Sequence, residues 1–261
     1  MRGFTLGLIL VCVTLMAGGA WAGDGVGLAG VTPEFAPKTR GGAGQEFVAF
    51  SQWAGPVGRS GGVGGVGVLG FTASVGEVQT TPAGYGSAVD AARRVVSPGY
   101  ASLGLTDNRV LLELAGRGRA AVYRMTFPES EQCHALIDVS YPRDRFEGGE
   151  IRLHDAKTIE GFGEYRVGGE VVRVYFTFRF SKPFRQRSAW DGTGVLDRGV
   201  GRAESPQALG AYVFFWNREG ETILVKRGVS TVSLEDARAS LYRDFPGWDF
   251  NGLVREARAA E

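Results

Sequence analysis

Residues 172–180 read Val-Arg-Val-Tyr-Phe-Thr-Phe-Arg-Phe, and this stretch decides the fold class. Valine or phenylalanine stands at every second position, with arginine, tyrosine or threonine between. Because successive side chains of a β-strand point to opposite faces, the pattern predicts one face on a core and one in water. Such a strand is typical of an antiparallel sheet.

Further strand-like segments lie on both sides of this one, at residues 119–127, 135–139, 150–153, 157–162, 211–216 and 221–226. Turn-forming residues separate them: Pro98-Gly99, Asp107-Asn108, Gly116-Arg117-Gly118, Gly148-Gly149, Gly168-Gly169 and Arg218-Glu219-Gly220. Many short strands with such turns predict an all-β sandwich or barrel, which we place at residues 23–232.

Helical signals close the chain, at residues 233–261. Ser233-Leu234-Glu235-Asp236 resembles a capping box, in which Ser233 accepts a hydrogen bond from the amide three residues on. Pro246 ends this first helix, and Asp249 is placed to cap a second. We therefore expect two short C-terminal helices that form a linker.

The first part of the sandwich region, residues 23–95, is rich in glycine, so we expect loops with short strands between them. Within it, residues 65–70 spell the glycine pattern of dinucleotide-binding folds. That pattern binds a pyrophosphate only when a helix follows it. Here the β-prone sequence Phe71–Val75 follows, so we expect no nucleotide cofactor.

Residues 1–22 have the layout of a secretory signal peptide: Arg2, an apolar run from Phe4 to Met16, and the small-x-small sequence Ala20-Trp21-Ala22. We therefore expect a secreted or periplasmic protein with no membrane partner after cleavage. With 29 basic and 28 acidic residues the net charge is close to zero, which gives no indication of nucleic acid binding. Only Cys133 remains after cleavage, and we expect it to be buried.

No set of residues indicates catalysis or a metal site. The two histidines, His134 and His154, lack a partner at metal-ligand spacing, so core or surface positions are favoured. Acidic residues crowd residues 138–155, but Arg143 and Arg145 are interleaved, which favours a salt-bridged loop over a pair of glycosidase carboxylates.

Tryptophans are the remaining candidates for binding. Trp53 and Trp190 lie in polar or glycine-rich sequence, where an aromatic face can stack on a sugar ring; plain packing is the alternative. Trp216 and Trp248 fit packing better.

Several segments, taken in order, resemble the amino-terminal domain of glycoside hydrolase family 92, the calcium-dependent, inverting exo-α-mannosidases. The similar segments are Val96–Tyr100, Tyr123–Pro128, Ile159–Phe162, Val174–Phe176, Phe180–Phe184, Val225–Ser230, Val232-Ser233 and Pro246–Phe250. Order and spacing agree over about residues 96–258.

The resemblance implies an antiparallel β-supersandwich, related to galactose-mutarotase-like domains. In the full enzymes it packs against an (α/α)6 barrel, which supplies the catalytic acids and most calcium ligands. The chain ends where that barrel would begin, so we expect no catalytic residue and no metal ligand here, and calcium only with a separate catalytic domain. The family also has a Gly-Phe-Ser-His-Thr-His type segment near the sugar; Gly70-Phe71-Thr72-Ala73-Ser74 is similar to it but has no histidine.

Three hypotheses follow. The first is a non-catalytic sandwich that binds carbohydrate; the resemblance implies mannosides as the sugars, contacted by Trp53, Phe71 and Trp190. The second is part of a split or truncated α-mannosidase that acts with a separate (α/α)6 domain. The third is a structural or protein-binding remnant.

Overall fold

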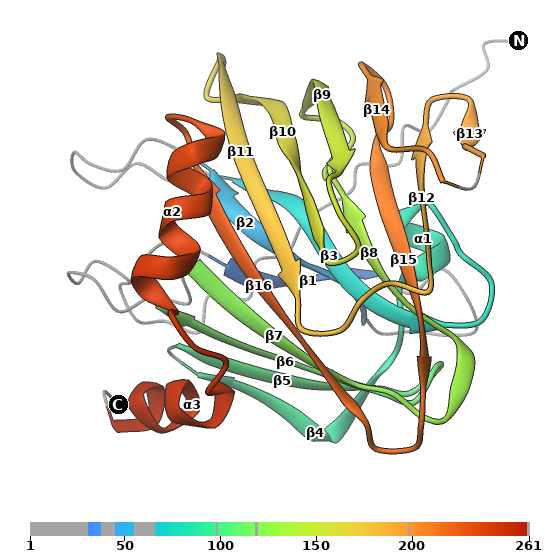
Figure 1. Ribbon diagram of the computed structural model, residues 1–261, viewed down its shortest axis with the longest axis vertical. Helices are drawn as coiled ribbons and strands as arrows, with labels where there is room; N and C mark the ends of the chain where they lie inside the picture. The colour runs from blue at the N-terminus through green and yellow to red at the C-terminus, as the bar shows by residue number, and fades with distance from the viewer. Residues whose placement is uncertain are drawn as a thin grey trace, which may run out of the picture.

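The structure, a computed structural model, describes residues 31–37, 45–54, 66–97, 99–117, 120–197 and 199–259 (Figure 1). One sheet has seven strands, in the order β1 (Val31–Pro37), β2 (Gln45–Ala54), β3 (Val66–Val75), β8 (Ser130–Asp138), β15 (Gly210–Asn217), β12 (Gln186–Asp191) and β13 (Gly194–Val195). The other has nine, in the order β14 (Arg202–Ser205), β9 (Phe146–Leu153), β10 (Thr158–Val167), β11 (Glu170–Phe180), β16 (Thr222–Ser230), β7 (Ala120–Thr126), β6 (Val110–Arg117), β5 (Tyr100–Leu105) and β4 (Val89–Ser97).

The two sheets pack face to face around one apolar core, so the predicted all-β sandwich is confirmed. Neighbouring strands pair antiparallel, as between β10 and β11. Across the core, the Phe71 ring of one sheet lies 4.2 Å from Tyr123 and 5.6 Å from Phe178 of the other, centroid to centroid. Rings packed in this way bury large apolar areas, and burial of apolar surface is the main favourable contribution to folding.

The stretch that predicted the fold forms β11, in the middle of the nine-stranded sheet. Its apolar face is buried as expected: Phe176, Phe178 and Phe180 have no exposed surface. The expectation that the other face lies in water is wrong at Thr177, which is only 1% exposed. Helix α2 (Leu234–Asp244) covers this outer face beside β11 and β16 (Figure 1), because its own apolar stripe must be buried.

The glycine-rich region forms longer strands than predicted. β2 and β3 have ten residues each, and β3 lies between β2 and β8 in the seven-stranded sheet. A Cβ atom on Gly67 would lie 2.1 Å from the Ser51 hydroxyl oxygen. Glycine therefore permits close packing inside a strand here rather than marking a loop.

Two glycine pairs behave differently. Gly168-Gly169 form the turn between β10 and β11, both with positive φ, as predicted. The turn predicted at Gly148-Gly149 is wrong, because both residues lie within β9. Gly148 has φ +149°, and the register between β9 and β10 shifts beside it. The pair thus forms part of a β-bulge, which the sequence does not distinguish from a turn.

The two predicted C-terminal helices are confirmed. Ser233 caps α2, since its hydroxyl accepts a hydrogen bond from the Asp236 amide at 3.1 Å. Asp249 accepts from the Gly252 amide at 2.8 Å at the start of α3 (Phe250–Ala259). A one-turn helix, α1 (Pro82–Tyr85), was not predicted. Within the described part of the chain, no helix is long and apolar enough to cross a membrane.

Candidate functional site

The structure does not bring the three predicted sugar-contacting residues together. Phe71 is fully buried between the sheets. Trp190 belongs to a second apolar cluster, on the outer face of the seven-stranded sheet. Trp53 lies in β2 opposite Gly67, and its side chain is outside the described residues, as are residues 1–22 with the predicted signal peptide.

Trp190 was predicted in a loop, and that placement is wrong. It lies in β12 opposite Gly210 and is 1% exposed. Its indole ring covers the neighbouring strand, where a Cβ on Gly210 would lie 2.1 Å from Trp190 Cζ2. Because the ring packs against the sheet, neither of its faces is open to a sugar in this structure.

The cysteine, the buried histidine and the acidic segment that the sequence offered for chemistry are engaged in packing or ion pairs. Cys133 is buried, as expected, and burial raises the pKa of its thiol to about 11. His134 is buried, with its ring 5.1 Å from that of Phe214, and burial lowers its pKa. The acidic segment is salt-bridged in part, since Glu147 accepts from Arg166 at 2.7 Å. No group of three or more potential ligands could hold a metal ion within the described ranges.

Asp138 is the deeply buried member of that acidic segment, and its carboxylate lies 3.7 Å from the Arg143 guanidinium. It lies in β8 between Gly70 of β3 and Gly210 of β15, and is 2% exposed. Its carboxylate accepts hydrogen bonds from the Tyr85 hydroxyl at 2.9 Å and the Ser140 hydroxyl at 2.7 Å. Burial raises the pKa of Asp138, and the charge of Arg143, together with these two hydrogen bonds, opposes the rise.

Tyr85 connects this buried carboxylate with a surface hollow of about 350 Å³. We call the hollow the acidic pocket. Its lining comes from the start of β2, the end of β3, the segment around α1 and the turn between β5 and β6: Glu46, Ser74, Val75, Glu77, Gln79, Ala83, Gly84, Tyr85, Gly86, Ala88, Asp107 and Asn108.

Hydrogen bonds hold the walls of the acidic pocket. The Asn108 side-chain amide donates to the Ser74 hydroxyl at 3.0 Å, which joins the β5–β6 turn to β3. The Ala88 amide donates to the Asp107 carboxylate at 2.9 Å, which joins the α1 segment to the same turn. The walls are therefore fixed before any ligand arrives, which lowers the entropic cost of binding.

The lining of the acidic pocket has a definite chemistry. Among the described residues, it offers the carboxylates of Glu46, Glu77 and Asp107, two side-chain amides and one aromatic ring, but no lysine or arginine. Carboxylates accept hydrogen bonds and amides both donate and accept. The sequence did not single these residues out, because they lie in glycine-rich and turn segments that meet only in the folded chain.

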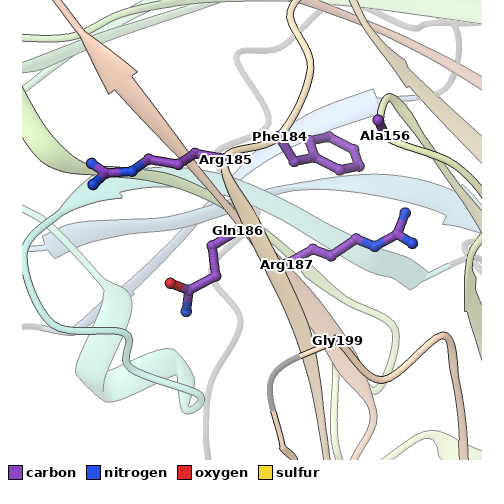
Figure 2. A pocket seen from close by; sticks show the side chains of 6 residues that line it. All are labelled: Ala156, Phe184, Arg185, Gln186, Arg187 and Gly199. Atoms are coloured by element: carbon purple, nitrogen blue, oxygen red, sulfur yellow. The ribbon is translucent and has the colours of Figure 1, made fainter.

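A second hollow, of about 300 Å³, lies between the β9–β10 turn and the start of β12 (Figure 2). We call it the arginine pocket. It is lined by Ala156, Phe184, Arg185, Gln186, Arg187 and Gly199. Figure 2 shows the Arg185 and Arg187 side chains pointing away from each other, with Arg187 on the same side as the Phe184 ring.

These features define a class of protein: a two-sheet antiparallel β-supersandwich with a pocket on its surface and two helices on its outer side. The sequence model described as the glycosyl hydrolase family 92 N-terminal domain matches residues 43–230. The chain belongs to this family. No curated protein matches it.

Solved structures share the fold. A family GH92 α-mannosidase from Bacteroides thetaiotaomicron is 23% identical, with a TM-score of 0.73, and the match covers 90% of this chain and 34% of that one. An inverting GH92 mannosidase from strain VPI-5482 of the same organism is 19% identical, with a TM-score of 0.72, 90% of this chain and 32% of that one covered. This chain thus spans about a third of the length of these enzymes.

Proposed function

We propose that this protein is an exported carbohydrate-binding domain that is not catalytic on its own, and that the acidic pocket holds the sugar. The observation that carries the proposal is the lining of that pocket, in which carboxylates, amides and the Tyr85 ring surround one hollow. Sugar hydroxyls donate hydrogen bonds to carboxylates and accept them from amides, so both kinds of polar group in the pocket can bind a sugar.

The size and rigidity of the acidic pocket support this proposal. Its volume of about 350 Å³ lies at the lower end of the range for ligand sites, which suits one sugar residue. The Tyr85 ring is held in place because its hydroxyl donates to buried Asp138. A fixed aromatic wall can pack against the apolar face of a sugar.

The kind of sugar and the absence of catalysis rest on the family. The solved structures that share the fold are named mannosidases, which supports a mannoside as ligand. They are nearly three times as long as this chain. The family resemblance assigns the catalytic acids to the barrel, which supports binding rather than bond cleavage here.

Calorimetric titration with methyl α-mannoside and mannan tests the proposal. We expect millimolar binding, which Glu77→Gln weakens about threefold to tenfold because it removes a charged acceptor from the pocket. Glu170→Gln is the matched control, since Glu170 is exposed at the far start of β11. Absence of heat at millimolar ligand, or equal effects of both variants, contradicts the proposal.

A second function is support of a separate catalytic domain. Exposed apolar side chains in α2 and in the segments beside it favour this function. Val232, Tyr242 and Trp248 are 73%, 60% and 38% exposed. Large apolar side chains on such a surface indicate an interaction site. Mixing the protein with a family 92 barrel and calcium should then give hydrolysis of an aryl mannoside; no gain over the barrel alone contradicts this function.

A further inference from the structure

The arginine pocket has rigid walls that come from three parts of the chain. The Phe184 amide donates to the Ala156 carbonyl at 2.8 Å, which fixes the β11–β12 connection to the β9–β10 turn. The Gly199 amide donates to the Arg187 carbonyl at 3.4 Å. The Phe184 ring packs on the core edge, 5.0 Å from Phe180. The hollow therefore belongs to the sandwich and does not depend on one loop.

The two arginines of this pocket differ in how their charge is compensated. Arg185 lies 3.2 Å from the Glu131 carboxylate. Arg187 donates to the Asp155 carbonyl, a neutral group. Among the residues that the structure describes, no carboxylate lies within 4.0 Å of the Arg187 guanidinium, and no acidic residue lines the pocket. The pocket therefore carries about one uncompensated positive charge, at Arg187.

A guanidinium beside an aromatic ring is suited to a sugar that carries an anionic group. The planar fork of arginine matches a carboxylate, which it binds through two parallel hydrogen bonds. Arg187 and Phe184 both line the pocket, and Figure 2 shows their side chains on the same side of the strand. The volume of about 300 Å³ fits one sugar residue.

We infer that the arginine pocket binds a hexuronate, with the sugar carboxylate on Arg187 and the sugar ring against Phe184. One positive charge matches the single negative charge of a carboxylate better than a phosphate monoester, which carries about −1.5 to −2 at pH 7. This inference goes beyond the proposed function. It concerns a different hollow, so either site can fail without the other.

Two-dimensional amide NMR of the labelled protein separates the two sites. Glucuronate should shift the amides of Ala156, Arg185, Arg187 and Gly199, whereas methyl α-mannoside should shift residues 77–86 and leave these unchanged. The inference is overturned if glucuronate moves none of the arginine-pocket amides, or if the neutral mannoside moves them equally. Failure of the mannoside alone affects only the proposed function.

Titrations of variants test the role assigned to Arg187. We expect Arg187→Gln to weaken glucuronate binding about tenfold or more, because a charged hydrogen bond is lost. Arg187→Lys should fall between, since lysine keeps the charge without the fork. Arg243→Gln is the control and should change the affinity less than about twofold, because this exposed arginine lies in the last turn of α2 and does not line the pocket. Equal losses in Arg187→Gln and Arg243→Gln, or tighter binding of mannose 6-phosphate than of glucuronate, refute the inference.

Discussion

Replacement of Arg124 by methionine should destabilise the protein by about 3–5 kcal/mol, because it leaves a buried charge without its partner. Arg124 of β7 donates to Glu113 of β6 through Nε at 2.6 Å and Nη2 at 2.7 Å. The Glu113 side chain is only 5% exposed, and it also accepts a hydrogen bond from the Tyr100 hydroxyl at 2.8 Å. Arg124 also holds α3, through Asn251 at 2.8 Å and the Phe250 ring at 4.3 Å.

A second arginine provides a matched control for this prediction. Arg173 of β11 also donates twice to a glutamate of the adjacent strand, Glu164, and also lies over a ring, that of Phe162. Arg173 and Glu164 are 46% and 30% exposed, more than Arg124 and Glu113. Arg173→Met should therefore cost only about 0.2–1 kcal/mol, as exposed ion pairs do.

Urea unfolding measures both free energies. We expect Arg124→Met to lower the melting temperature by about 10 °C, at ~2–4 °C per kcal/mol for a chain of this size. Adding Glu113→Gln to Arg124→Met should recover part of the loss, because the buried charge is then removed. If Arg124→Met and Arg173→Met lower the free energy of unfolding equally, burial of Glu113 does not explain the contribution of the Arg124–Glu113 pair, and the reasoning is refuted.

Three further predictions concern single positions. Burial raises the pKa of Asp138, so its contribution to stability is lost as the pH rises through the native pKa. Asp138→Asn should therefore gain stability relative to the native protein as the pH rises above about 4, the ordinary pKa of the group, and a pH-independent difference in urea unfolding contradicts this. Gly210→Ala should cost about 1–3 kcal/mol or more, because its Cβ overlaps Trp190, whereas Gly201→Ala, with open space around it, should not shift the melting temperature. Ser233→Ala should cost about 1 kcal/mol in the same assay through loss of the α2 cap, and an unchanged value would show that the cap adds nothing.

Local patterns predicted the parts of the fold that depend on local physics. The alternation in residues 172–180 gives β11, and Ser233 caps α2 as its position predicts. Predictions failed where a distant segment decides the environment. Thr177 is buried because α2, far along the chain, covers it. Trp190 is buried because Gly210, on the neighbouring strand, leaves room for its ring.

The candidate sites could not be predicted in the same way. The acidic pocket joins Glu46 of β2, Ser74 of β3 and Asn108 of a turn, which are far apart in the sequence. None of these segments has a pattern that indicates binding by itself. Only the pairing of β2 with β3, and the bond from Asn108 to Ser74, places them around one hollow.

By itself, the sequence determined the strand periodicity, the helix cap and the family, because each of these is written in residues close together along the chain. The tertiary structure alone decided which polar groups are buried, which of the two arginines in the arginine pocket has a carboxylate partner among the described residues, and where hollows form. These properties depend on which strands become neighbours. Sheet pairing joins residues of large sequence separation, so their electrostatic and packing environment exists only in the folded chain.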